Sequence, residues 1–279
     1  MNVSWDALRS TTLRAAWGRY TQPQPIHGLQ LGDRIGVFAP AERAEQKGLG
    51  VEHRWRNALT ARVELYDRRM TRVRPRFVNQ SNQLLVFPEL EYDRLRIDPT
   101  SSRARGFETF VQHAGEGRVE WSGAYALSKV TDRVDGRDVP RGIDQRHAFN
   151  ADWAFHPMSN RWRFSVAWLR HSGWPATSQS FKVDTLGTGT SRRIFITTLF
   201  GPYNAERLPA YQRFDVRCTR YWDTRRGRVA LYADVFNLFG RENPRGYDYG
   251  IWSLNPYVVK RAYDTLLPRL PSIGISWDF

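Results

Sequence analysis

Long apolar runs and paired cysteines are both missing from this chain of 279 residues. No stretch of about 18 consecutive apolar residues occurs, and the mean hydropathy is -0.58, which excludes a membrane-spanning helix. The single cysteine, Cys218, excludes an intrachain disulfide framework. The histidines are scattered and have no cysteines or paired carboxylates beside them, so we predict neither a metal site nor a cofactor.

Lysine is also scarce, although the formal net charge is +14. The basic residues are almost all arginines, no block of five or more Lys or Arg occurs, and no zinc-finger, RNP or helix-turn-helix pattern is visible. Because the arginines are scattered along the whole chain, we do not predict nucleic-acid binding. Anionic surroundings, such as lipopolysaccharide or an acidic ligand, suit this charge better.

Aromatic residues are abundant at 14%, and they belong to segments in which apolar and polar residues alternate. Period-two alternation predicts β-strands with one apolar face. We expect about ten strands, each long enough to cross a bilayer at about nine to eleven residues. They lie near residues 12–17, 48–55, 59–66, 106–112, 119–128, 148–155, 162–169, 214–219, 229–235 and 271–279.

The second face of these strands carries many charged residues, which a protein core does not tolerate. A wide, wet lumen does tolerate them, so the apolar face is expected to meet lipid. The charged residues are Arg14, Glu52, Arg54, Glu64, Glu108, Glu120, Asp152, Arg163, Asp215, Arg217 and Asp234.

The connections between the expected strands alternate between short and long. Short ones fall at 56–57, 114–117, 156–160 and 223–227, and long ones at about 21–43, 69–101, 130–145, 171–210 and 239–269. Short periplasmic turns opposite long extracellular loops are typical of outer-membrane β-barrels. The predicted fold class is therefore an all-β, antiparallel transmembrane barrel in the outer membrane of a Gram-negative bacterium. A soluble β-rich ligand-binding protein stays open as a weaker alternative.

The last nine residues, PSIGISWDF, place four large apolar side chains on one strand face and end on an aromatic residue. This tail resembles the C-terminal assembly signal of outer-membrane barrels, which implies recognition by the barrel-assembly machinery. The residues of this signal are Ile273, Ile275, Trp277 and Phe279.

Several segments resemble the C-terminal half of the β-barrel of TonB-dependent outer-membrane receptors. They include LRAAWGRYTQPQ at 13–24, VPRGIDQRHAFNADWAF at 139–155, RLPAYQRFDVRCTRYW at 207–222 and ALYADVFNLFGRENPRGYDY at 230–249. The resemblance implies a 22-stranded barrel with an internal plug domain and energised uptake of a siderophore, cobalamin or glycan. It also implies that the TonB complex acts through an N-terminal region.

Residues 1–279 show no plug, no TonB-contacting segment and no signal peptide, because Met1–Asp6 has neither a basic nor an apolar region. We therefore expect the chain to be the C-terminal part of such a receptor. Ten strands would either close into a small barrel or form a curved sheet with two open edges.

An independent ten-stranded porin or rim protease is the alternative function. Asp144 and His147 would form the protease pair at the extracellular rim. The segment DQRH is better explained as the start of a strand, and no catalytic residue is predicted.

Ligand contact is expected in the long loops. Arg72, Arg74 and Arg76 form an alternating basic row, and Trp174, Tyr203 and Arg207 offer stacking and anion pairing. Such groups at a receptor mouth suit an anionic chelate or a sugar. Contact with lipopolysaccharide, or plain solvation of these side chains, is the competing explanation.

Overall fold

The computed structural model describes residues 1–279 except 27–28, 30–34, 57, 83, 86, 92–93, 116, 158–160, 188–192 and 255–256. Antiparallel strands make up most of the described chain. Among the described residues there is no helix long and apolar enough to cross a membrane.

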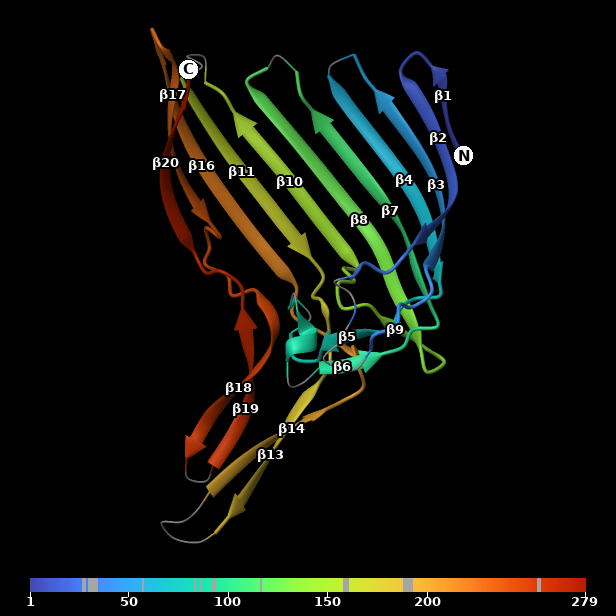
Figure 1. Cartoon of the computed structure of the whole chain (residues 1–279). Helices are drawn as coiled ribbons and strands as arrows, with labels where there is room; N and C mark the ends of the chain where they lie inside the picture. The colour runs from blue at the N-terminus through green and yellow to red at the C-terminus, as the bar shows by residue number, and fades with distance from the viewer. Residues whose placement is uncertain are drawn as a thin grey trace.

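One large sheet forms the body of the molecule, and Figure 1 shows it as a curved wall. Its strands follow the order β1-β2-β3-β4-β7-β8-β10-β11-β16-β17-β20, with β9 added beside β8. Their bounds are β1 Asn2–Leu8, β2 Thr11–Gln22, β3 Glu42–Arg54, β4 Leu59–Thr71, β7 Ser101–His113, β8 Val119–Val134, β9 Arg137–Pro140, β10 His147–Phe155, β11 Trp162–His171, β16 Tyr211–Thr224, β17 Gly227–Phe236 and β20 Leu270–Asp278.

All ten expected strands are present, and β1 is an additional one. The segment NVSWDAL alternates Val3 and Trp5 with Ser4 and Asp6, and it pairs with β2 after a turn at Arg9–Ser10. In the described part of the chain, β1 pairs with β2 alone and β20 with β17 alone. Of the two expected outcomes, the structure therefore shows the curved sheet with two edges.

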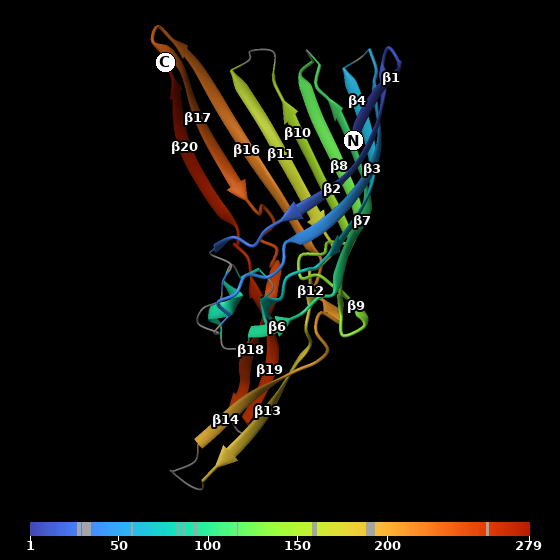
Figure 2. The same cartoon turned by 45° about the vertical axis from the view of Figure 1, so that its right-hand side comes forward.

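The short turns lie at one end of the sheet and the long loops at the other (Figures 1 and 2). The predicted hairpin turn at Arg56–Asn57 falls at the short-turn end, although Asn57 itself lies outside the described residues. The C-terminus lies at this same end. This arrangement makes the short-turn end periplasmic and the loop end extracellular.

The apolar face of the strands points outward, as predicted. Leu49, Leu65, Ile273 and Ile275 are 55–73% exposed, whereas Glu52, which has the opposite parity in β3, is only 8% exposed. Near the periplasmic end this outward face carries a belt of tryptophans, as barrels do at the lipid–water interface. The belt consists of Trp121, Trp153, Trp162, Trp222 and Trp277, each 37–53% exposed.

The loops form smaller structures of their own at the extracellular end. In the part of the chain that the structure describes, they contain paired strands and a short 3-10 helix, η3 (Pro88–Leu90). The pairs are β5 (Arg76–Asn79) with β6 (Arg94–Ile97), β12 (Pro175–Ala176) with β15 (Glu206–Arg207), β13 (Gln179–Leu186) with β14 (Arg193–Phe200), and β18 (Pro244–Leu254) with β19 (Tyr257–Thr265). A small apolar cluster of Trp174, Ala176, Leu208, Tyr211 and Tyr247 lies in this region.

Candidate functional site

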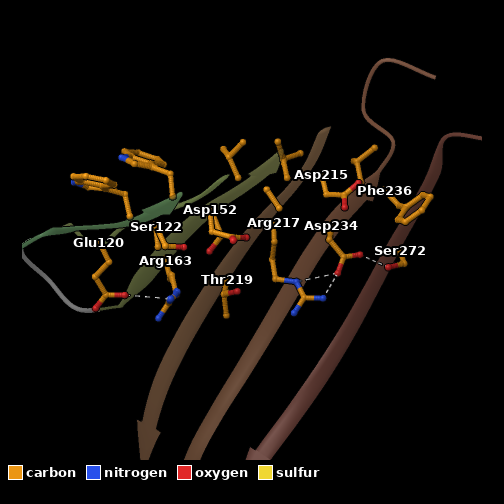
Figure 3. Close-up of a pocket in the computed structure, with 18 of the residues that line it drawn as sticks. Glu120, Ser122, Asp152, Arg163, Asp215, Arg217, Thr219, Asp234, Phe236 and Ser272 are labelled. Atoms are coloured by element: carbon orange, nitrogen blue, oxygen red, sulfur yellow. Dashed lines mark hydrogen bonds and ion pairs between the residues drawn. The ribbon is translucent and has the colours of Figure 1, made fainter. Parts of the chain in front are cut away.

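The inner face of the sheet is polar and laid out in ion pairs, as Figure 3 shows for the strands from β8 to β20. The guanidinium of Arg163 lies 3.4 Å from the Glu120 carboxylate. Arg217 donates from Nε to Asp234 over 3.0 Å, and the Ser272 hydroxyl donates to the same carboxylate. These side chains line a hollow of about 920 Å³, together with Asp152 and Asp215.

The same arrangement continues across the first strands. Glu52 is buried and forms ion pairs with Arg14, at 3.3 Å, and with Arg54. Arg62 and Glu64 form another pair on β4, with a separation of 3.4 Å. Many of the predicted lumenal charges are thus paired with opposite charges on the same face, which lowers the cost of keeping this face polar.

A buried carboxylate organises the extracellular loops. Asp132, 2% exposed, accepts hydrogen bonds from Arg76 and, at 2.8 Å, from Arg141. Asp132 belongs to the extension of β8 that pairs with β9 beyond the membrane-spanning part. Burial opposes ionisation there, but the two guanidinium groups hold the pKa of Asp132 below its usual range. This network therefore links the start of β5, the end of β8 and the residue that follows β9.

Tyr203 lies close to the same network. Burial raises the pKa of its phenol to about 12. Tyr203, Arg76 and Arg141 line a cavity of about 230 Å³ with Asn79 and Ile143. Two of the six predicted ligand-contact residues, Arg76 and Tyr203, are thus brought together.

A second buried carboxylate, that of Asp144, binds Arg207, another of the six predicted ligand-contact residues. Arg207 donates to the Asp144 side chain, to the Asp144 carbonyl at 2.9 Å and to the Gly173 carbonyl at 3.0 Å. Trp174 is 9% exposed, and its ring lies 4.6 Å from that of His171. Arg207 and Trp174 therefore stabilise the base of the loops at this point.

The remaining two predicted residues lie apart from these networks. Arg74 donates from Nη2 to Glu42 over 3.0 Å, whereas Arg72 is exposed and has φ 55°. Ligand contact by all six residues stays a prediction. The carboxylates of Asp132 and Glu42 are not predictable as site residues, because Arg76 and Arg74 reach them from distant positions in the sequence and no local spacing marks them.

The Asp144–His147 pair weighed for a rim protease is not assembled. The Asp144 carboxylate is taken by Arg207 and by the backbone N–H of Val130, at 2.6 Å. Nδ1 of His147 lies 2.8 Å from the hydroxyl of Tyr125 instead. Without an Asp–His hydrogen bond this segment has no activated base. Across the described residues, no group of three or more His, Cys, Asp or Glu side chains is placed to hold a metal ion.

The C-terminal strand presents the predicted assembly signal on the outward face. Ile273, Ile275 and Trp277 are 53–73% exposed, and Phe279 is 97% exposed. The Trp277 indole donates to the Arg226 carbonyl over 3.2 Å, which fixes it against the β16–β17 turn. The signal is accessible along its whole length, and its recognition stays a prediction.

An outward apolar band, an inner polar face and turns and loops at opposite ends define an outer-membrane β-barrel protein. The family model described as TonB dependent receptor-like, beta-barrel, matches residues 1–238, and the chain belongs to this family. No curated protein matches the chain significantly. The protein is thus a receptor-type barrel protein of the Gram-negative outer membrane.

Solved structures show the same fold at low sequence identity. FpvA of Pseudomonas aeruginosa, bound to heterologous pyoverdines, is 11% identical with a TM-score of 0.58, covering 100% of this chain and 32% of FpvA. The ferric citrate transporter FecA is 17% identical with a TM-score of 0.59, covering 98% of this chain and 37% of FecA. The FrpB iron transporter from Neisseria meningitidis is 13% identical with a TM-score of 0.60, covering 100% of this chain and 37% of FrpB. The chain spans about a third of the length of these structures.

Proposed function

We propose that residues 1–279 are the C-terminal part of a TonB-dependent receptor barrel that takes up a scarce ligand. The observation that supports this most is the ion-paired inner face on a sheet whose edges, β1 and β20, do not pair with each other in the described chain. Such a face suits a wide lumen that holds a polar plug domain. The plug and the remaining strands would come from outside these 279 residues.

The proposed ligand is an anionic ferric chelate, with cobalamin and glycans as the other candidates. FecA is named as a ferric citrate transporter and FpvA as a pyoverdine outer membrane receptor, and this chain shares their fold. The loop end carries the basic side chains Arg72, Arg74, Arg76 and Arg207. A guanidinium has five N–H donors, so an arginine already paired with a carboxylate still has donors for a ligand.

Three kinds of partner belong to this proposal. The TonB complex would supply energy through the N-terminal region of the receptor, and the barrel-assembly machinery would recognise Phe279 and the outward residues of β20. Outer-membrane lipid, including lipopolysaccharide, would surround the outward face.

Uptake by living cells tests the proposal. Cells that carry the gene should take up radiolabelled iron from ferric citrate or a ferric siderophore only when TonB is present, and Arg72→Gln should lower this uptake several-fold. Lys182→Gln, in the β13–β14 loop hairpin, is the control and should leave uptake unchanged. Passage of small solutes without TonB would contradict the proposal and favour the porin alternative.

A further inference from the structure

The hairpin of β13 and β14 extends farther from the barrel wall than the other loop structures (Figures 1 and 2). On one side, β13 lies against β19 of the neighbouring hairpin. On the other side, β14 pairs with β13 alone among the described strands. The outer side of β14 therefore carries backbone N–H and C=O groups that no described strand pairs with, and we call it the open edge.

The register of the hairpin shows which residues of β14 face the open edge. The Gly201 N–H donates to the Ser178 carbonyl over 2.9 Å, and this pair continues the β13–β14 register. Along an antiparallel ladder, hydrogen-bonded pairs alternate with pairs that share no hydrogen bond. The residues whose backbone groups point away from β13 are therefore Ile194, Ile196, Thr198 and Phe200.

The open edge has none of the features that protect an exposed strand from pairing, which are charges, prolines, bulges and short length. β14 reads RIFITTLF, in which Arg193 is the only charged residue and neither Pro nor Gly occurs. Six of the seven residues after Arg193 are β-branched or aromatic, the types that favour strands most. Ile194 and Phe195 point to opposite faces and are 38% and 49% exposed, so both faces are accessible there.

The other loop hairpins do carry protective features. β18 begins with Pro244, contains Arg245 and Asp248, and has two register shifts against β19. β5 and β6 are four residues long and include three arginines, and β12 and β15 are two residues long. The unprotected edge thus lies on the hairpin that reaches farthest from the membrane.

A second copy of the chain does not fit the open edge well. Because the loop ends of two receptors face outward from the same membrane, their β14 strands would run in the same direction. An antiparallel pair between the two copies is therefore excluded, which leaves only the less stable parallel pair. A segment of another protein has no such restriction and can approach from outside the cell in the antiparallel direction.

We infer that the open edge of β14 binds an extended segment of a second protein at the cell surface, as the third strand of the hairpin. Main-chain hydrogen bonds to the edge give such strand addition its affinity, and the neighbouring side chains give it specificity. The added strand lies beside Phe195 and Leu199 on one face and beside Ile194 and Ile196 on the other. The partner segment is therefore apolar or β-branched and has few charges. The inference does not depend on the proposed iron uptake.

The first test uses a fluorescent eight-residue peptide of alternating Thr and Val, and the same peptide methylated at every backbone nitrogen. Fluorescence anisotropy measures their binding to the protein purified from outer membranes in mild detergent. The unmethylated peptide should bind at least about tenfold more tightly, because methylation removes the N–H donors of the added strand. Equal binding of the two peptides, or binding of neither, overturns the inference.

The second test changes the edge itself. Ile196→Pro removes an N–H that points away from β13, so the hairpin keeps its own hydrogen bonds while the open edge is blocked. This variant should bind the unmethylated peptide at least about tenfold more weakly, whereas the control Ile196→Val keeps the N–H and should bind it fully. Equal binding by the Ile196→Pro variant contradicts the inference.

A further variant covers the case in which proline disturbs the hairpin. Thr198→Lys leaves every backbone group in place but adds a charge that an added strand would cover, so it should weaken peptide binding several-fold. Unchanged binding by this variant also contradicts the inference. A doubled mass of the unaltered protein that Ile196→Pro abolishes would assign the edge to a second copy and overturn it. Iron uptake measured on the same variants reports separately on the proposed transport.

Discussion

At the scale of single residues, the extracellular loops depend on two buried carboxylates. Asp132 and Asp144 are 2% and 1% exposed. Asp132 is held by Arg76 and Arg141, and Asp144 is held by Arg207. Removing one member of such a buried group leaves its partners without compensation. Arg76 and Arg207, two of the arginines predicted to contact ligand, therefore also hold the loops together.

Asp132→Asn should loosen the loops without unfolding the sheet. Loss of the charge that Arg76 and Arg141 share costs about 3 kcal/mol, because the carboxylate is almost fully buried. We expect trypsin added to intact cells to cleave the loops at 72–100 and 135–146 faster than in the unaltered protein. Because the pKa of Asp132 is lowered, the unaltered loops should loosen in the same way only when the pH falls below the ordinary value of 3.8.

The control is Asp98→Asn. Asp98 is exposed and lies 3.7 Å from Arg96, so this surface pair contributes little. Equal cleavage rates in the Asp132 variant and the unaltered protein would show that the network does not stabilise the loops.

At the scale of elements, alternation predicts the membrane strands well. Ten of the eleven strands along the sheet were predicted from apolar residues at every second position, and the same pattern in Val3 and Trp5 marks β1. Alternation succeeds because the outward face meets lipid and the inward face meets a wet lumen, so each strand carries its own signal.

The loop structures could not be predicted in the same way. The β5–β6 and β18–β19 hairpins show no clean alternation, because their side chains pack on other loops and not between lipid and water. The networks around Asp132 and Asp144 join residues 56 and 63 positions apart, and no local motif reports such contacts. The lumenal charges were predictable as a set, but not their individual ion pairs.

The C-terminal strand gives a prediction about assembly. Deletion of Phe279 should lower the amount of protein in the outer membrane several-fold, although the residue is 97% exposed and its ring lies 5.5 Å from that of Trp277. The measurement is the heat-modifiable fraction in outer membranes. Leu267→Ala, at a residue 60% exposed in a loop, is the control and should have no effect. Unchanged amounts after deletion of Phe279 would argue against the assembly signal.

At the scale of the whole molecule, the central claim is that this sheet is part of a wider barrel. An open edge in hydrocarbon leaves backbone N–H and C=O groups unsatisfied, at a cost of several kcal/mol each. The β1 and β20 edges therefore need other strands beside them. In a small closed barrel, by contrast, these two strands would lie about 4.8 Å apart and pair with each other.

Disulfide trapping between inward-facing positions of β1 and β20 tests this claim most directly. In a Cys218→Ser background, Ser4→Cys with Ser276→Cys should form no disulfide in outer membranes. Ala230→Cys with Ser276→Cys, which are opposed in register between β17 and β20, should cross-link fully and serves as the positive control. A disulfide between positions 4 and 276 would show that the chain closes on itself, and it would contradict the account.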